Sequence, residues 1–183
     1  MIITGEDFIL RPFERSDSSA LAAHCNNPKI AKNMRDTFPS PYTESDAKRF
    51  IENVLLCSPP LTHFVIDINR EAAGTFTILM KQDVYRYNVE IGYFLAEKHW
   101  GKNIMCKVIR RMVDYTFNNF EIKRVYAEVF SPNTPSMKVL EKSGFSREAI
   151  LTKNIYKNGQ LLDTHVFSLL KEQWEKPGTD CRS

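Results

Sequence analysis

The chain has 183 residues, of which 43% are apolar and 26% are charged, and this composition is ordinary for a globular protein. Its length fits one domain, and its formal net charge of +3 is too small by itself to indicate nucleic-acid binding. The sequence contains no apolar run of about eighteen residues, and its N-terminus, MIITGEDFILRPF, lacks a basic segment followed by an apolar one. We therefore expect neither a membrane span nor a secretory signal.

The four cysteines are widely separated along the chain and show no zinc-like spacing with histidine. They are Cys25, Cys57, Cys106 and Cys181. We expect free thiols in a reducing cytoplasm, and no metal site.

The first half of the chain predicts one strand, then helices, then a hairpin. DFILRPF reads as a strand, followed by a helix over SDSSALAAHCNN that is capped by Ser16. A short helix over NPKIAKNM has Pro28 in its first turn, and a longer helix over TESDAKRFIENVLLCS begins after Thr43 as its cap. PPLTHFVIDINREAAGTFTIL predicts two strands joined by a turn at Asn69 and Arg70.

The second half predicts strands that are interrupted by two helices. YNVEIGYFLA is a strand that leads through Gly101 into an amphipathic helix, and KRVYAEVF alternates as a strand does. NTPSMKVLEKSG predicts a helix that ends at Gly144, and the last two strands surround a hairpin turn at Lys157–Gly159. The pattern indicates an α/β (α+β) fold with a mixed sheet in one domain over residues 1–173, and a polar tail over 174–183.

The turn WGKNIM combines features that suit phosphate binding. A helix N-terminus offers unpaired N–H groups and a partial positive charge. Gly101 lets the backbone approach an anion closely, Lys102 adds a cation, and Asn103 is the non-glycine residue that best tolerates a positive φ. A plain strand–helix turn is the alternative. The sequence has neither a GxxxxGK segment followed by Ser or Thr nor a GxGxxG after its first strand, which disfavours nucleotide hydrolases and dinucleotide-binding folds.

Read together, VEIGYFL, HWGKNIM and RRMVDYTFNNFEIKRVYAEVFSPNTPSMKVLEKSGF resemble the GNAT (GCN5-related N-acetyltransferase) superfamily. The resemblance is to the branch that contains the ribosomal-protein N-terminal acetyltransferases. Its motifs appear here as Glu90–Tyr93, Trp100–Met105, Asn133 with Ser136, and Gly144–Phe145. FILRPF and HVFSLLKEQW extend the resemblance over almost the whole chain.

The resemblance implies a splayed mixed sheet of about seven strands, with acetyl-CoA in a V-shaped gap between NVEIGYFL and KRVYAEVF. The pantetheine arm would pair with exposed backbone as an added strand, and the pyrophosphate would rest on the turn and helix N-terminus. The implied coenzyme-binding residues are Phe94, Leu95, Ala96, Gly101, Lys102, Asn103, Ile104, Met105, Cys106, Asn133 and Lys138.

Acetyl transfer to an amine needs a neutral amine, a stabilised oxyanion and a proton for the thiolate. Many GNAT members place a tyrosine acid where this chain has Leu140, so Ser136, one turn earlier, is the candidate to reach the sulfur; the alternative is a bond to its own helix backbone. Glu90 is the candidate base or ammonium-binding group, and a cross-strand salt bridge is its alternative. Cys106 lies at a helix start, which can lower a thiol pKa, but direct transfer requires no nucleophile.

We expect an acetyl-CoA-dependent N-acetyltransferase acting on a primary amine, with a non-catalytic acyl-CoA-binding module as the alternative. The acceptor is left open among a protein N-terminus, a polyamine, an amino acid and an antibiotic. Its pocket is expected near Arg35, Phe38 and Tyr42, with Tyr85 and Tyr87 opposite. We expect no nucleic-acid or membrane partner, and either a monomer or a homodimer.

Overall fold

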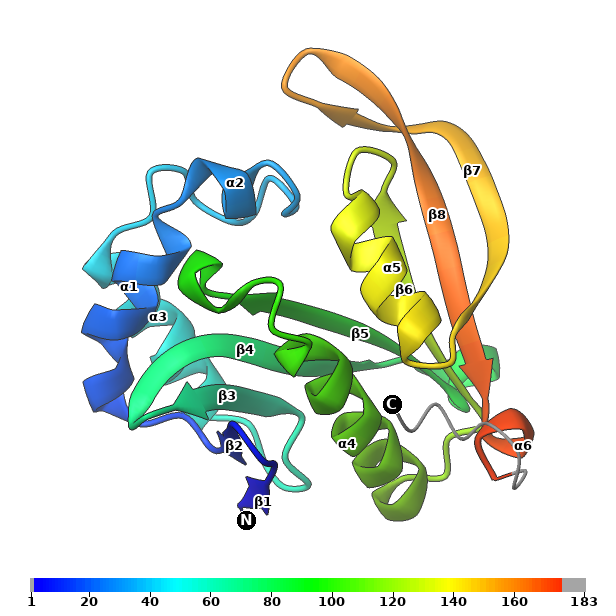
Figure 1. The fold of residues 1–183 in the computed structure, drawn as a ribbon, viewed down its shortest axis with the longest axis horizontal. Coiled ribbons are helices and arrows are strands. Elements are labelled where there is room, and N and C mark those ends of the chain that lie inside the picture. Colours follow the sequence, from blue (N-terminus) through cyan, green and yellow to red (C-terminus); the bar gives the residue numbers. More distant parts are fainter. Residues whose placement is uncertain (1, 176–183) are drawn as a thin grey trace. The chain divides into compact units, whose positions relative to one another are not determined.

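The computed structural model describes residues 2–175 (Figure 1). The strands are β1 (Ile3–Thr4), β2 (Ile9–Arg11), β3 (His63–Ile68), β4 (Glu71–Met80), β5 (Asn88–Leu95), β6 (Arg124–Phe130), β7 (Ser146–Lys157) and β8 (Gln160–Leu170). The α-helices are α1 (Ser18–Cys25), α2 (Pro28–Ala31), α3 (Glu44–Leu55), α4 (Ile104–Asn119), α5 (Thr134–Lys142) and α6 (Lys171–Trp174). Short 3₁₀ helices are η1 (Arg15–Asp17), η2 (Asp83–Tyr85) and η3 (Glu97–His99). No helix in this range is both long and apolar enough to cross a bilayer.

The sheet of the described residues has eight strands in the order β1-β2-β3-β4-β5-β6-β8-β7. β5 and β6 are parallel and pair where Asn88–Glu90 face Arg124–Tyr126, whereas β2 with β3, β3 with β4, and β6 with β8 are antiparallel. The predicted mixed sheet is therefore confirmed, with eight strands where about seven were expected. The chain divides into two compact units, Met1–Thr77 with Tyr93–Ile104 and Ile78–Gly92 with Met105–Ser183.

Both predicted hairpin turns are confirmed, and their backbone explains the residues found there. Asn69 and Arg70 have φ of 55° and 65°, and Asn158 and Gly159 have φ of 50° and 81°. Two successive residues with positive φ are the mark of the tight turn whose twist matches that of paired strands. Asparagine and glycine tolerate this conformation best, so the sequence placed these turns correctly.

Helix boundaries follow side-chain caps, with one prediction wrong. Thr43 caps α3 in a reciprocal box with Asp46, and Asn133 caps α5. Ser16 is not the cap of α1, because the chain first makes the 3₁₀ turn η1. The N-cap of α1 is Asp17, one residue after the predicted cap, and its side chain makes no capping bond to α1. Its carboxylate instead accepts from the Glu14 amide at 2.8 Å, across η1. Residues 176–183 of the predicted tail lie outside the described part.

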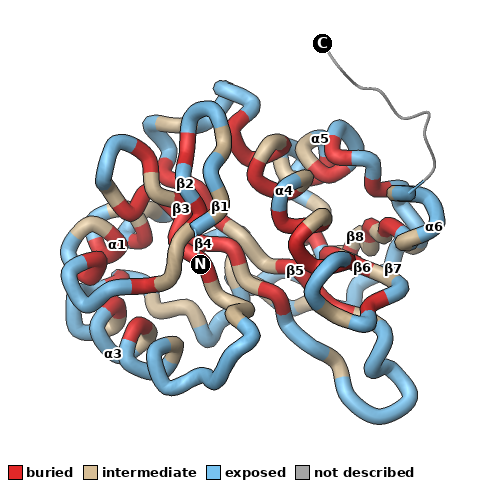
Figure 2. The backbone as a smooth tube through the Cα atoms, turned by 90° about the horizontal axis from the view of Figure 1, so that it is seen from below, coloured by how far each residue is buried: buried red, intermediate tan, exposed pale blue. Residues whose placement is uncertain are grey.

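The first unit builds its core between the early helices and the sheet. α1 and α3 pack side by side (Figure 1). Figure 2 shows β3 largely buried, while the outer turns of α1 and α3 are exposed. The buried cluster consists of Phe13, Leu21, Ala22, Cys25, Ile30, Tyr42, Ala47, Ile51, Val65, Ala72 and Phe94. Phe94 therefore anchors the end of β5 in this core through its side chain.

The second unit contains α4, whose apolar stripe is fully buried at Val108, Ile109 and Met112. β6 alternates between buried and less buried positions, with Val125, Ala127 and Val129 on the buried side. The predicted helical and strand periodicities are both confirmed here.

Candidate active site

The turn before α4 has the backbone expected of an anion cradle. Gly101 and Asn103 both adopt left-handed conformations, with φ of 75° and 59°. The predicted positive φ at Asn103 is therefore confirmed. A Cβ at Gly101 would meet no atom within 4 Å, so crowding does not require glycine here. The left-handed backbone conformation is what favours it. The 16-residue helix α4 begins directly afterwards at Ile104, where its first N–H groups lack helical partners.

Ion pairs hold the segment just upstream of this turn. Glu97 in η3 accepts from Asn27 Nδ2 at 2.8 Å and pairs with Lys29. Lys98 Nζ lies 2.6 Å from Glu71, whose other carboxylate oxygen lies 2.7 Å from His24 Nε2. The Lys98 hydrogen bond is the main reason why the pKa of Glu71 is lowered. Sequence reasoning missed these contacts because the paired residues are up to 70 positions apart.

His99, the last residue of η3, carries a buried Nε2 atom for which the described residues supply no hydrogen-bond partner. Burial lowers the pKa of His99, and the charges of Lys98 and Lys102 lower it further. The ring is therefore held toward its neutral form next to the turn.

At the end of β5, the structure shows which backbone groups of Phe94, Leu95 and Ala96 are already hydrogen-bonded or in close contact within the protein. The Ala96 amide donates to the Ala73 carbonyl at 2.7 Å, so this N–H is not available to a ligand. The Phe94 carbonyl lies close to Gly74, where a Cβ would be 2.4 Å away from it. The Leu95 carbonyl accepts from the indole Nε1 of Trp100 at 2.6 Å. Of the three predicted residues, Ala96 thus has its amide bonded within the fold, and Leu95 has its carbonyl bonded by an indole.

Glu90 is buried on β5 and forms the salt bridge that was its alternative interpretation. Its Oε2 lies 2.9 Å from Lys81 Nζ, which follows β4. The same ammonium lies 5.5 Å from the centre of the Tyr126 ring. The hydrogen bond to Glu90 raises the pKa of Lys81. The base role of Glu90 stays a prediction, and this ion pair is the contact that such a role would have to accommodate.

The residues predicted on α5 lie at its N-terminal cap and in its first two turns. Asn133 Oδ1 accepts from the Ser136 amide at 3.3 Å, so Asn133 has the capping role that was one of its two expected functions. Ser136 is half-buried, Lys138 is exposed, and Leu140 is fully buried. Coenzyme contacts by Asn133 and Lys138, and a catalytic role of Ser136, stay predictions.

The expected acceptor residues differ widely in exposure. Tyr42 is buried in the core of the first unit, with its ring 4.8 Å from that of Phe38, so it does not line an open pocket as predicted. Arg35 is exposed, as are Tyr85 and Tyr87 in the second unit. Tyr42 packs in this core together with Phe38 from the same loop.

Comparison with known proteins identifies the family. Residues 7–146 match the family model described as "Acetyltransferase (GNAT) domain". The chain belongs to the GNAT acetyltransferase family. It is 32% identical over 174 residues to the uncharacterized N-acetyltransferase p20 of Bacillus licheniformis, covering 92% of this chain and 96% of that protein. It is 25% identical over 166 residues to the spermidine N(1)-acetyltransferase of Vibrio cholerae, covering 90% of this chain and 94% of that protein.

The fold agrees with this assignment. The solved structure of RimL, a ribosomal L7/L12 alpha-N-protein acetyltransferase in complex with coenzyme A, superposes with a TM-score of 0.81 at 18% identity, covering 93% of this chain and 98% of that chain. The chain is thus an N-acetyltransferase of the GNAT family with acetyl-CoA as its cosubstrate, and the alternative of a non-catalytic module is disfavoured.

In this GNAT enzyme the Cys106 thiol is unsuited to attack. Burial raises its pKa, whereas the helix start had suggested that the pKa could be lowered. Its Sγ lies 3.7 Å from the Val139 carbonyl on α5, which is a packing position. The structure thus agrees with transfer that needs no covalent cysteine intermediate.

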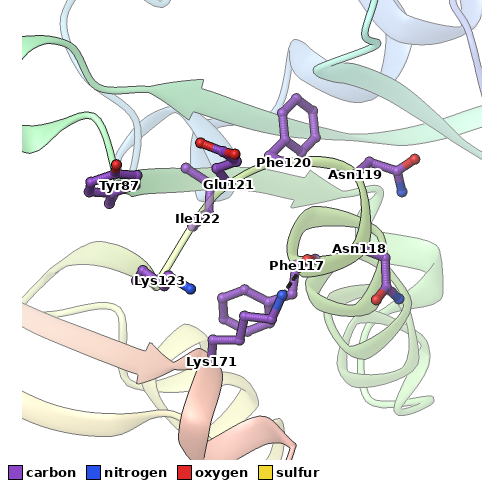
Figure 3. A pocket seen from close by; sticks show the side chains of 9 residues that line it. All are labelled: Tyr87, Phe117, Asn118, Asn119, Phe120, Glu121, Ile122, Lys123 and Lys171. Atoms are coloured by element: carbon purple, nitrogen blue, oxygen red, sulfur yellow. Dashed lines mark hydrogen bonds between the residues drawn. The ribbon is translucent and has the colours of Figure 1, made fainter.

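A pocket of about 540 Å³ lies in the second unit, and none of the residues predicted to bind coenzyme A lines it (Figure 3). Its lining is Tyr87, Phe117, Asn118, Asn119, Phe120, Glu121, Ile122, Lys123 and Lys171. Lys171 Nζ donates to the Phe117 carbonyl at 2.9 Å, which satisfies the C-terminal end of α4. We do not assign the coenzyme to this pocket.

Proposed function

We propose that this enzyme transfers the acetyl group of acetyl-CoA directly to an α-amino group, with the turn Gly101–Cys106 receiving the pyrophosphate. The observation that carries the coenzyme part is the pair of left-handed residues, Gly101 and Asn103, directly before the 16-residue helix α4. A helix N-terminus that is entered through such a turn presents several N–H groups to one anion. Lys102 is exposed beside it and adds a positive charge.

The chemistry requires one donor at the thioester oxygen. The amine nitrogen attacks the thioester carbon, the oxygen becomes an oxyanion, and the C–S bond then breaks to release the thiolate of coenzyme A. We assign the oxyanion contact to the Leu95 N–H. The proton lost by the amine leaves through water, with Glu90 as the proposed relay, and the thiolate takes its proton from Ser136 or water.

The acceptor assignment rests on protonation and charge. Glu90 already pairs with Lys81 at 2.9 Å, so an ammonium acceptor would compete with a resident cation. An α-amine, with a pKa of about 8, is neutral in roughly a tenth of molecules at pH 7, whereas an alkylamine of pKa about 10.4 is neutral in fewer than about one in a thousand. The α-amine therefore needs less help from a base.

The segment expected to bind the acceptor also disfavours a polycation. Residues 26–42 contain Lys29, Lys32 and Arg35 against the acidic Asp36, and Lys29 is paired with Glu97. The small positive excess that is left favours the amino end of a peptide or an amino acid over a polyamine. The spermidine acetyltransferase relative shows only that the family includes proteins named for a polyamine acceptor.

A thiol-release assay tests this proposal. Acetyl-CoA is offered with lysine-free peptides that have a free α-amine, with N-terminally blocked peptides that contain lysine, with spermidine and with single amino acids. We expect kcat/KM for an α-amine to exceed that for spermidine by at least about tenfold, and to rise with pH up to about 8. Preference for spermidine would contradict the acceptor assignment, and binding of coenzyme without turnover on any amine would favour the non-catalytic module.

The same assay tests Ser136. Ser136→Ala should lower kcat while the dissociation constant for coenzyme A, measured by calorimetry, stays within about twofold of the original. Unchanged kcat would remove Ser136 from the mechanism and leave water as the proton donor. Oligomeric state and a cytoplasmic location stay predictions.

A further inference from the structure

Trp100 closes a small loop at the end of β5. Its indole Nε1 donates to the carbonyl of Leu95 at 2.6 Å, and its own amide donates to the Glu97 carbonyl at 3.0 Å. The loop from Leu95 to Trp100, which contains η3, is thus closed by a hydrogen bond between its first and last residues. Trp100 is 44% exposed, so burial of its ring does not fully account for its position.

The indole of Trp100 bonds to the carbonyl of Leu95, whereas backbone groups of the two neighbouring residues face β4. The Ala96 amide points to Ala73 on β4, and the Phe94 carbonyl lies against Gly74 on the same strand. Successive residues of a strand direct their N–H and C=O groups to opposite edges. The N–H and C=O of Leu95 therefore lie on the edge away from β4.

On that edge the indole of Trp100 occupies the Leu95 carbonyl, which is the acceptor, and does not bond to the Leu95 N–H, which is the donor. An uncapped strand edge offers both an N–H and a C=O, and a carbonyl lone pair would repel a developing oxyanion nearby. With its carbonyl satisfied by Trp100, Leu95 presents its N–H as the group that remains for a ligand. The short bond also fixes the plane of the peptide that follows Leu95, which reduces the rotation open to the Leu95 backbone.

We propose that Trp100 is a positioning residue, which holds the Leu95 backbone so that its N–H is directed at the thioester oxygen of acetyl-CoA. This inference rests on the proposed function, because it needs acetyl-CoA at the end of β5. It assigns to Trp100 an effect on the transition state, through Leu95, rather than a contact with the coenzyme. The expected signature is a fall in kcat with little change in coenzyme affinity.

The chain offers a matched control. Trp174 in α6 is the other tryptophan, and its indole Nε1 also donates a hydrogen bond, at 2.7 Å to Asp114 on α4. Trp174→Phe therefore removes the same kind of bond from a site outside the proposed machinery. It also leaves Trp100 as the single tryptophan, so that its fluorescence and its indole N–H resonance are assigned without ambiguity.

The experiment compares the original enzyme, W174F and W100F for kcat, the KM for acetyl-CoA and the dissociation constant of coenzyme A. Loss of a complete oxyanion donor costs about 10²–10³ in kcat, and loss of its support should cost less. We expect W100F to lower kcat about tenfold, with a coenzyme dissociation constant within about threefold. W174F should match the original enzyme.

A kcat of W100F within twofold of that of W174F, or an equal loss of coenzyme binding and turnover, would overturn the inference. If W100F does not fold, the indole N–H of Trp100 in W174F gives a second measurement. Slow solvent exchange of that N–H, kept on adding acetyl-CoA, supports the inference, and rapid exchange overturns it. If the original enzyme and W174F neither bind coenzyme A nor release thiol, the proposed function itself fails, which is a distinct result.

Discussion

Asn103 and Asn158, like Asn69, hold left-handed backbone conformations, with φ of 59° and 50°. Asparagine bears this conformation at a small cost because its short side chain can hydrogen-bond locally. Asn158 shares a hairpin turn with Gly159, far along the chain from the coenzyme turn. Asn103 lies in the turn Gly101–Cys106, so its Cβ lies on the backbone that we expect to receive the pyrophosphate.

Asn103→Gly should therefore tighten coenzyme A by about twofold to fivefold, which is less than 1.4 kcal/mol, because the backbone can then approach the phosphate without a Cβ. Its effect on the free energy of unfolding should be within about 0.5 kcal/mol, since relief of strain and the greater entropy of the unfolded chain oppose each other. Calorimetric titration measures the first quantity and denaturant unfolding the second. Asn158→Gly is the control, with similar stability and unaltered affinity. Weaker binding by Asn103→Gly would show that the amide side chain itself contacts the coenzyme.

At the level of elements, β4 and β5 contain glycines with opposite requirements. A Cβ at Gly74 on β4 would lie 2.4 Å from the Phe94 carbonyl and 3.1 Å from Leu95 Cα. A Cβ at Gly92 on β5 would meet no atom within 4 Å. The absence of a side chain at Gly74 thus permits a close approach of the backbone at the end of β5. At Gly92 there is room for a side chain.

Gly74→Ala should lower the free energy of unfolding by about 1–3 kcal/mol, because backbone atoms have to move apart to admit the methyl group. For a chain of this size that corresponds to a fall in Tm of about 3–10 °C. Gly92→Ala should leave stability unchanged or raise it by up to about 1 kcal/mol through the unfolded state. Calorimetric melting of both variants measures the difference. Equal losses at the two positions would contradict the crowding argument.

The elements themselves could largely be predicted, because their signals are local. The cap at Thr43, the turn at Asn69–Arg70 and the stripe of α4 depend on residues within one or two turns of each other. The burial of Tyr42 and the identity of Lys81 as the partner of Glu90 could not, since each depends on which strands and helices become neighbours. The left-handed backbone at Gly101 and Asn103 could be predicted from the sequence. The hydrogen bond from Trp100 back to Leu95 could not, because side-chain direction at a strand end depends on η3.

At the scale of the whole molecule, the protonation of His99, which lies just before the turn at Gly101, affects the stability of the fold. Its pKa is lowered in the folded protein by burial and by Lys98 and Lys102. The ordinary value in the unfolded chain is about 6.5. Between the two values the unfolded chain binds more protons, so the stability that depends on neutral His99 is fully present above about pH 6.5 and is lost as the pH falls through the folded pKa.

His99→Gln removes this titration and should flatten the decline in the free energy of unfolding below about pH 6.5. Urea unfolding between pH 5 and pH 8 measures the slope for both proteins, and the difference between variant and original should be constant above about pH 7.5. Burial also lowers the pKa of His63, so His63→Gln should flatten the same limb independently. Since the two histidines lie on separate elements, the double variant should show the sum of the two effects. Parallel curves for His99→Gln and the original protein, or a steeper acid decline in the variant, would mean that the folded state does not hold His99 neutral beside the turn.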